Sequence, residues 1–304
     1  MFCSSVFPLL ILPSDLQLLL RPWLFCSICS MAPVPQRIVS LQPSATVTLR
    51  DLGKLNSVVA CTRYCVEVCP EIAGSGAQIV ADSWTADSRQ ITPLEPELVI
   101  AAVPYQEKSL AEILKSGARF LGLAPKCLAD IYTDIAMIAA IVDARDDGEL
   151  LVQRMQDSIA AVRRKTQLLA RPRVFCEEWG KPLIASQKWV AELVEAAGGE
   201  FFGIPGAKLS FEEVKSAAPD VLIAAWCGAG DRVPLEKIVA RRGWERTTAV
   251  LNHRVCCIRD EFLNTPASTL IHGLQALAAA MHPEHFPQVE GLRWINKGWQ
   301  LQSP

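Results

Sequence analysis

Short apolar runs alternate along this chain with longer segments in which apolar residues recur every three or four positions. From Arg37 onward the short runs predict strands, and the longer segments predict helices, some of which end at a glycine such as Gly53 or Gly117. The predicted strands are residues 37–41, 57–61, 97–103, 119–123, 173–177, 221–225 and 255–259, and the predicted helices are residues 44–52, 109–115, 187–197, 235–241 and 268–281. This alternation favours an α/β fold with parallel sheets and helices on both faces.

The same local pattern occurs once in each half of the chain. Each copy begins with a helix N-cap residue (Asp87, Ser210) and has a glutamine or glutamate three positions later (Gln90, Glu213), which predicts a reciprocal capping box. A short helix, a proline, an acidic residue and a buried-type strand follow. The two copies are residues 87–100 and 210–223. A unit used twice indicates two similar lobes, so we expect a functional cleft between them.

The longest amphipathic stretch lies between these halves. Its apolar stripe consists of Val152, Met155, Ile159, Val162, Thr166 and Leu169. Glu149 near its start and Pro172 beyond its end bound a helix of about 21 residues, roughly 32 Å long. Such a helix either bridges the lobes rigidly or packs on one of them. The predicted organisation is an N-terminal lobe at 37–142, a connecting helix at 143–171, a C-terminal lobe at 172–286 and a tail at 287–304.

Residues 1–36 are predicted to lie outside the lobes. Their apolar runs are interrupted by Pro8, Pro13 and Arg21, so they do not supply the ~20 apolar residues of a spanning helix. No basic region opens the chain, as a secretory signal would require. Either this segment is a mis-assigned upstream start, with Met31 as the true one, or it is a degenerate export signal; a folded segment is a third reading.

Composition excludes some functions and bears on the compartment. The net charge of −2 gives no positively charged surface that would bind nucleic acid. We also expect the protein to be a monomer. Several of the eleven cysteines are single residues inside apolar strands, where cysteine acts as a small hydrophobe. Because free thiols are typical of a reducing compartment, the sequence favours a cytoplasmic protein; a periplasmic or membrane-anchored one is the alternative.

Aromatic residues follow the predicted strands in both halves. In open parallel sheets, ligands bind at the carboxyl ends of the strands. The candidates there are Arg63, Tyr64, Tyr105, Glu178, Trp179 and Trp226, with Trp84 in the loop before the first repeat copy. Aromatic faces suit a large, flat, partly apolar ligand. Trp189 and Trp244 fall on a helix face and in a loop, and we expect them to be packing residues.

The chain resembles a known family at several positions. The residues that carry the resemblance are 37–46, 62–65, 96–100, 178–179, 189–199 and 243–245. Together they are similar to substrate-binding proteins of cobalamin and ferric-siderophore ABC importers, in particular the cobalamin-binding-like branch called helical-backbone metal receptors. The resemblance covers about residues 36–286. It implies two Rossmann-like lobes with parallel sheets joined by a long rigid helix, a class III periplasmic-binding-protein-like architecture, and it implies no catalysis.

The resemblance also implies a ligand and a partner. Tyr64, Trp84, Trp179 and Trp226 would line a site for a metal chelate, foremost a cobalamin-like corrinoid, carried as cargo and not as a cofactor. Each lobe of the family carries an outward glutamate that docks on permease arginines. Glu212 matches this pattern, whereas Arg89 at the other position reverses the charge. A soluble carrier or sensor of the same ligand is therefore an alternative to an importer subunit.

Other functions remain as alternatives. A ferric siderophore or haem could occupy the same cleft, and an anionic siderophore would need cations such as Arg63, Lys181 or Arg259. A chelatase-like enzyme on the same scaffold would need a buried histidine–glutamate pair, which the sequence does not indicate, so we expect no enzyme. Cys61, Cys65 and Cys69 are spaced by four, but Pro70 and the lack of a fourth ligand argue against a metal site.

Overall fold

The computed structural model describes residues 33–103 and 107–296. Residues 35–304 form one compact unit that contains two sheets. The first sheet has the order β3-β2-β1-β4-β5, and all its neighbouring strands are parallel. Its strands are β1 (Ile38–Ser40), β2 (Val58–Thr62), β3 (Gln78–Val80), β4 (Leu98–Ala102) and β5 (Arg119–Leu123). The helices of this N lobe are α1 (Pro43–Asp51), α2 (Arg63–Val68), α3 (Ser88–Ile91), α4 (Glu107–Leu114) and α5 (Leu128–Ile141), with 3₁₀ turns η2 (Leu55–Ser57), η3 (Pro70–Gly74) and η4 (Thr92–Leu94).

The second sheet is mixed and has the order β11-β10-β9-β6-β7, with β8 paired to β6. Its strands are β6 (Arg173–Gly180), β7 (Leu183–Ala185), β8 (Glu200–Phe201), β9 (Val221–Ala224), β10 (Val255–Ile258) and β11 (Leu292–Trp294). The C lobe's helices are α7 (Lys188–Ala196), α8 (Phe211–Ala217), α9 (Leu235–Arg242), α10 (Thr248–Leu251), α11 (Glu261–Asn264) and α12 (Leu270–Met281). β7 and β11 run antiparallel to their neighbours, so the expectation of an all-parallel sheet holds only for the N lobe. β11 also lies within the predicted tail.

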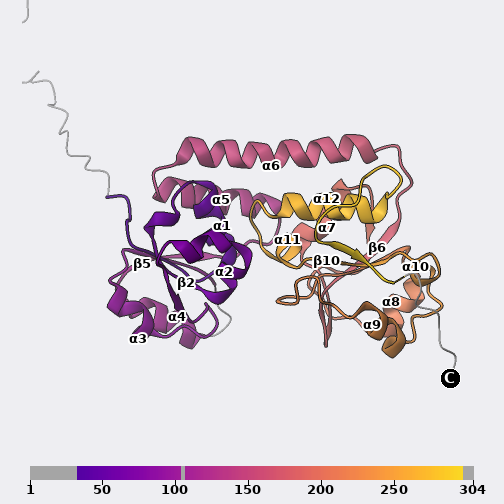
Figure 1. The fold of residues 1–304 in the computed structure, drawn as a ribbon, viewed down its shortest axis with the longest axis horizontal. Helices are drawn as coiled ribbons and strands as arrows, with labels where there is room; N and C mark the ends of the chain where they lie inside the picture. Colours follow the sequence, from indigo (N-terminus) through magenta and orange to yellow (C-terminus); the bar gives the residue numbers. More distant parts are fainter. Residues whose placement is uncertain (1–32, 104–106, 297–304) are drawn as a thin grey trace, which may run out of the picture. The chain divides into compact units, whose positions relative to one another are not determined.

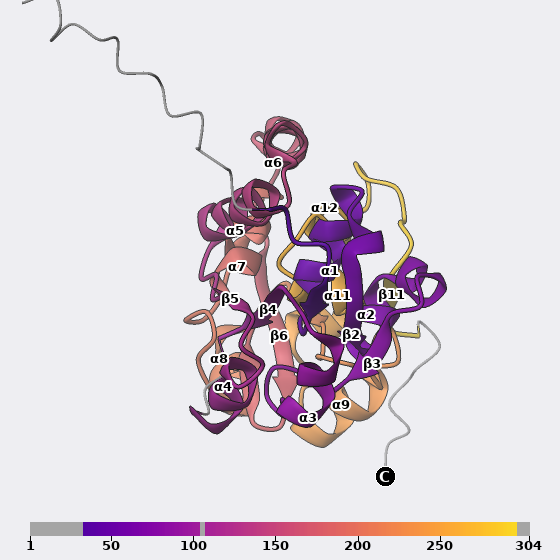
Figure 2. The ribbon, with the colours of Figure 1, turned by 90° about the vertical axis from the view of Figure 1, so that its left-hand side faces the viewer.

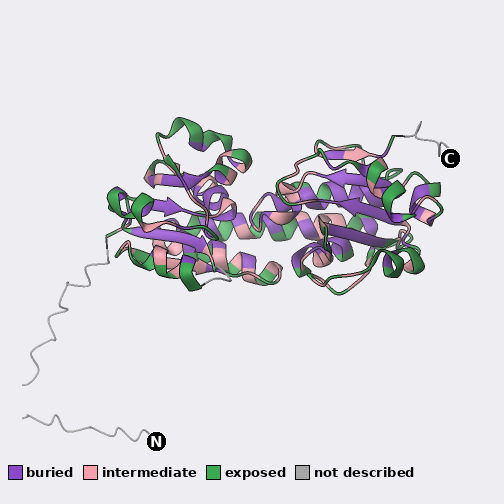
Figure 3. Ribbon diagram, turned by 90° about the horizontal axis from the view of Figure 1, so that it is seen from below, coloured by how far each residue is buried: buried purple, intermediate pink, exposed green. Residues whose placement is uncertain are grey.

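Central strands are buried on both faces because alternate residues point into different cores. In β1, Ile38 belongs to one cluster of buried side chains and Val39 to another. In β6, Val174 and Phe175 are divided in the same way. Helices therefore cover each sheet on two sides, as Figures 1 and 3 show. The alternation of strands and helices in the sequence predicted this layering correctly.

Helix α6 (Arg145–Thr166) is the long helix between the lobes. Met155 and Ile159 of the predicted stripe are buried, and α6 contacts α5 of the N lobe as well as α7 and α12 of the C lobe. Figure 2 looks along α6, with α5 and α12 beneath it. Gly148 allows close packing, since a Cβ there would lie 2.4 Å from the Cβ of Ala139. The helix thus bridges both lobes. No helix among the described residues is long and apolar enough to span a bilayer.

The two repeat copies anchor the first strand of their lobes in the same way. The Glu97 carboxylate accepts the Arg37 N–H at 3.2 Å, and the Asp220 carboxylate accepts the Arg173 N–H at 2.8 Å. These bonds tie the start of β4 to β1 and the start of β9 to β6. The acidic residue after the proline, which the repeat singled out, therefore has a structural role in both copies.

The helical segment of each repeat copy ends in the same backbone conformation, after η4 in the first copy and after α8 in the second. Glu95 and Ala218 both adopt a left-handed conformation, with φ of 45° and 46°. The arginine at the start of each lobe's first strand donates to a carbonyl just before that turn, Arg37 to Leu94 at 3.0 Å and Arg173 to Ala217 at 3.1 Å. This donor satisfies a helix-end carbonyl.

The predicted capping box forms in only one copy. Ser210 and Glu213 bond reciprocally, with the Ser210 N–H donating to Glu213 at 2.7 Å and the Glu213 N–H donating to the Ser210 hydroxyl at 3.2 Å. In the first copy Asp87 accepts the N–H of Arg89 at 2.9 Å. Gln90 instead accepts the N–H of Ala81 at 2.8 Å, because the loop after β3 lies within its reach. The prediction of a box at Gln90 is wrong.

Candidate functional site

The end of β2 places Arg63 and Tyr64 at the start of α2. The Thr62 hydroxyl caps this helix by accepting the Cys65 N–H at 3.2 Å, which fixes the turn from strand to helix. The Arg63 guanidinium lies 4.6 Å from the centre of the Tyr64 ring and donates to its hydroxyl at 2.6 Å. Arg63, a candidate for binding an anionic ligand, is thus engaged with the neighbouring aromatic residue.

Trp84 lies in the loop that follows β3. Its backbone is held on two sides, because the Ser83 hydroxyl donates to the Leu41 carbonyl at 2.9 Å and the Ser109 hydroxyl donates to the Trp84 carbonyl. The Trp84 side chain remains 41% exposed. Tyr105, the other N-lobe candidate, lies outside the described residues. A fixed backbone with an exposed aromatic ring is an arrangement that can contact a ligand.

At the end of β6, where the pairing with β7 shifts register, the adjacent carboxylates of Glu177 and Glu178 have different partners. Glu178 is half-buried, and its carboxylate accepts from the Gln187 amide at 2.7 Å. Burial raises the pKa of Glu178 above its ordinary value. Glu177 is only 3% exposed. The two carboxylates therefore act in different environments and do not form a facing pair.

Trp179 lies inside β6, where it pairs with Ile184 of β7, and Trp226 follows β9. Trp179 is 45% exposed, and its indole N–H donates to the Lys181 carbonyl at 3.0 Å. The Trp226 ring lies against Gly180, where an added Cβ would be 2.2 Å from a ring carbon. The Trp226 indole N–H donates to the Glu177 carboxylate. Both rings are thus held by their nitrogen atoms at the end of the C-lobe sheet.

A buried ion pair that no sequence pattern indicated lies behind Trp226. Arg242, at the end of α9, donates to both carboxylate oxygens of Glu177, at 2.6 and 3.2 Å. The two side chains are 6% and 3% exposed. The guanidinium also lies 4.7 Å from the Trp244 ring centre and 4.9 Å from that of Phe211. Trp244 is 2% exposed, which confirms it as a packing residue.

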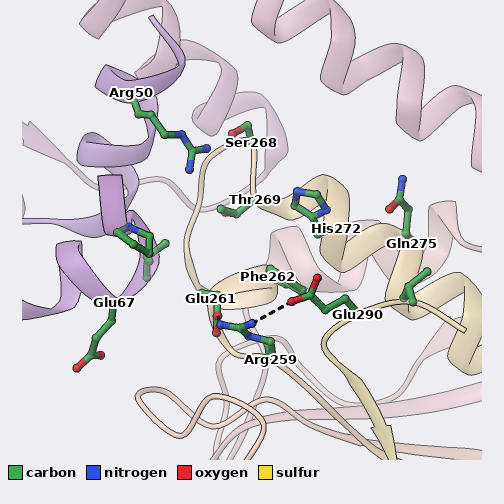
Figure 4. Close-up of a pocket in the computed structure, with 13 residues that line it drawn as sticks. Arg50, Glu67, Arg259, Glu261, Phe262, Ser268, Thr269, His272, Gln275 and Glu290 are labelled. Carbon is green, nitrogen blue, oxygen red and sulfur yellow. Dashed lines mark ion pairs between the residues drawn. The ribbon is translucent and has the colours of Figure 1, made fainter. Parts of the chain in front are cut away.

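A second missed feature is a cavity of about 410 Å³ between the two lobes. Arg50 and Glu67 line it from the N lobe, and Arg259, His272 and Glu290 line it from the C lobe (Figure 4). Of the aromatic residues predicted for the site, none that the structure describes borders it. The sequence predicts a strand at 255–259, and ligands bind at the carboxyl ends of such strands. Arg259, at the end of this strand, is therefore the part of the cavity wall that the sequence could indicate.

The cations around this cavity already have protein partners. Arg50 pairs with Asp51 at 2.8 Å. Arg259 pairs with Glu261 and, at 3.6 Å, with Glu290, the pair drawn in Figure 4. The lobes touch beside the cavity, where the Ser268 hydroxyl bonds the Asp51 carboxylate. The cavity wall is thus partly polar and partly apolar, and both of its arginines are paired with carboxylates.

The three cysteines spaced by four lie in the protein core. Cys61, Cys65 and Cys69 are each fully buried. Burial raises the pKa of Cys69 to about 11, so its thiol stays protonated at neutral pH. Within the described ranges, no group of three histidine, cysteine or acidic side chains is placed to hold a metal ion.

The residues predicted to dock on a permease lie at the starts of α3 and α8. Glu212 is exposed. The Arg89 side chain is 88% exposed and pairs with Asp87 at 2.7 Å. Asp87 thus places a carboxylate beside the guanidinium, so the charge reversal at Arg89 is partly compensated within the N lobe.

Comparison with known proteins gives the family. Residues 38–261 match the periplasmic binding protein family. An uncharacterized ABC transporter substrate-binding lipoprotein of Bacillus subtilis is 22% identical over 84% of this chain and 82% of its own length. A cobalamin-binding protein of Halobacterium salinarum is 23% identical over 82% of this chain and 70% of its own. The crystal structure of a periplasmic haem-binding protein from Pseudomonas aeruginosa superposes with a TM-score of 0.73 at 19% identity, covering 86% of this chain and 98% of that one.

The prediction of a cytoplasmic protein is wrong. The matched family is periplasmic, and the similar proteins include a lipoprotein and a periplasmic haem-binding protein. The prediction failed because it rested on free cysteines. Thiols such as Cys61 and Cys256, which have no exposed surface, are shielded from oxidants and do not report the compartment. The matched region spans both lobes and the helix between them, and so the chain belongs to the periplasmic binding protein family, whose members are solute-binding proteins and not enzymes.

Proposed function

We propose that this protein binds a cobalamin-like corrinoid between its two lobes and delivers it to an ABC permease. The observation that carries the proposal is one exposed indole from each lobe, Trp84 at 41% and Trp179 at 45%. Trp84 follows β3, which runs parallel to β2, and Trp179 lies near the end of β6, just beyond the part of that strand that runs parallel to β9. Large exposed aromatic side chains are costly in water and suit the flat face of a macrocycle. The similarity to a cobalamin-binding protein supports this ligand class.

The cations of the region argue against a strongly anionic siderophore as the first choice. Arg63 donates to Tyr64, and Arg259 is paired with two glutamates. An anionic ligand would have to break these contacts before it gained its own. Haem is the second candidate, because it offers the same flat apolar face and because a similar fold binds it.

Calorimetric titration tests the ligand directly. We expect one-to-one binding of cyanocobalamin, tighter than that of haemin or a ferric siderophore. Trp84→Ala and Trp179→Ala should each weaken it by ~1–3 kcal/mol, the loss of a stacked aromatic contact. Leu168→Ala, which truncates a side chain that is 90% exposed on the segment after α6, serves as the control. Cobalamin affinity unchanged in both tryptophan variants would contradict the site, and tighter haemin binding would replace the ligand.

The proposed delivery step depends on the outer ends of the lobes. Glu212 is exposed at the start of α8, and Arg89 occupies the matching place on α3. A permease that receives this protein would therefore meet a carboxylate on one lobe and a guanidinium paired with Asp87 on the other. A permease contact that depends on Glu212 but not on Arg89, measured by co-purification of charge-reversal variants, is the expected result.

A further inference from the structure

The indole nitrogens at the end of the C-lobe sheet are both used inside the protein. Trp179 donates to the Lys181 carbonyl at 3.0 Å, and Trp226 donates to the Glu177 carboxylate. Because an indole has a single donor, neither side chain retains an N–H for a ligand. This part of the proposed site can therefore offer ring surface but no indole hydrogen bond.

The acceptor for Trp226 is itself held in place by a buried charge. Arg242 contacts both oxygens of Glu177, and it also donates to the Gly180 carbonyl at 3.3 Å. Gly180 is the residue against which the Trp226 ring lies. The same guanidinium thus fixes both the atom that binds the indole nitrogen and the backbone that supports the ring. Phe211 and Trp244, each within 5 Å of the guanidinium, restrict its own position.

We propose that Arg242 is a positioning residue for ligand binding, which acts through Glu177 to hold the Trp226 ring against Gly180 with its N–H turned away from the ligand. This inference rests on the proposed function, and it adds Trp226, whose ring lies against Gly180 beside Trp179, to the chelate site. The Trp226 ring then favours a ligand with a broad conjugated or apolar face. It disfavours a ligand that needs a hydrogen bond from the indole N–H, because that N–H is already bound to Glu177. A corrinoid or porphyrin meets this requirement.

The position of the indole can be measured without any ligand. In a ¹H–¹⁵N spectrum the Trp226 indole peak is identified by its loss in Trp226→Phe, and we expect it downfield because its acceptor is charged. Glu177→Gln and Arg242→Met should each move this peak. Arg241→Met, which changes the exposed neighbour on the same helix, should not. An unmoved Trp226 peak in Arg242→Met would overturn the proposal.

The effect on binding is tested by a double-mutant cycle. Arg242→Met should weaken binding of cyanocobalamin roughly tenfold, and this loss should disappear in the Trp226→Ala background, because contacting residues that act together are not additive. Arg242→Lys, which keeps the charge, should restore part of the affinity. Equal losses in the two backgrounds would show a merely structural role and overturn the proposal.

Gly180→Ala provides a second variant if Arg242→Met does not fold. It leaves the ion pair intact, but its Cβ would meet the Trp226 ring, so the ring must move. We expect a shifted indole peak and affinity reduced to that of Trp226→Ala. Wild-type affinity in Gly180→Ala would contradict the inference. If the wild-type protein binds neither cyanocobalamin nor haemin, the proposed function fails, and the indole spectrum still decides whether Arg242 positions Trp226.

Discussion

The two lobes attach their repeat copies to the sheet in the same way but stabilise the outer helix differently. Glu97 and Asp220 tie corresponding strands together through one kind of hydrogen bond. In contrast, α8 has a complete capping box, whereas α3 is four residues long and has none. Phe211 at the start of α8 also covers the buried Arg242. The comparison teaches that the repeat preserves the path of the backbone and leaves the side-chain chemistry at the helix end free to diverge.

The largest difference in stability between the lobes should appear when the buried Arg242 of the C lobe and Arg37 of the N lobe are each replaced. Arg242→Met leaves the buried Glu177 carboxyl, whose pKa burial already raises, without its partner, and should lower the free energy of unfolding by about 3–5 kcal/mol. Arg37→Met in the N lobe removes a donor to the Leu94 carbonyl and should cost about 1 kcal/mol. Urea denaturation measures both. Equal losses would refute the contrast, and Arg242→Met combined with Glu177→Leu should recover much of the stability.

The shared anchors should instead behave alike. Glu97→Ala and Asp220→Ala each remove an acceptor from a backbone N–H at the start of a strand and should each cost about 1–2 kcal/mol in urea denaturation. Glu149→Ala, on the exposed face of α6, should change the free energy of unfolding by less than about 0.5 kcal/mol. If only one of these two substitutions lowers the free energy of unfolding, the lobes are not equivalent at this point.

A smaller effect of equal size is expected where the repeat helices end. Glu95 and Ala218 hold left-handed conformations that glycine adopts without a steric penalty. Glu95→Gly and Ala218→Gly should therefore raise the free energy of unfolding by about 0.5–1 kcal/mol each. Ala191→Gly, inside α7, should lower it by about 1 kcal/mol. Thermal denaturation of the three variants distinguishes relief of backbone strain from a general effect of glycine.

Features that repeat along the chain could be predicted from the sequence. The central strands, the long helix and the two-lobe plan follow from apolar periodicity, because burial on a fixed face imposes a fixed spacing. Other elements were not predicted: α5 is 14 residues long, α2 spans six, and β3 exposes two of its three residues at the sheet edge. β11 falls in the predicted tail because its three residues carry too little pattern to indicate a strand.

The site was only partly predictable, because its contacts join distant segments. Trp179 and Trp226 could be found as aromatic residues after predicted strands, and Trp84 as one in the loop before the first repeat copy. The Arg242–Glu177 pair joins residues 65 positions apart, and no local pattern marks it. The inter-lobe cavity is likewise lined by residues of α2 and α12, whose placement depends on how the lobes pack and not on either segment alone.

The smallest expected effect is a difference in pH dependence between the two repeat copies. The hydrogen bond from the Ser210 N–H lowers the pKa of Glu213, so its contribution to stability is present above the ordinary glutamate pKa and is lost as pH falls through the lowered value. Gln90, at the corresponding place, does not titrate. The melting temperature of Glu213→Gln should therefore lie below that of the wild type at pH 7 and approach it at pH 3. Gln90→Ala should show the same deficit at both values, because it loses only the bond from the Ala81 N–H. A deficit in Glu213→Gln that is unchanged from pH 7 to pH 3 would mean that the charge on this cap does not contribute to stability, and that the two helix ends differ in geometry alone.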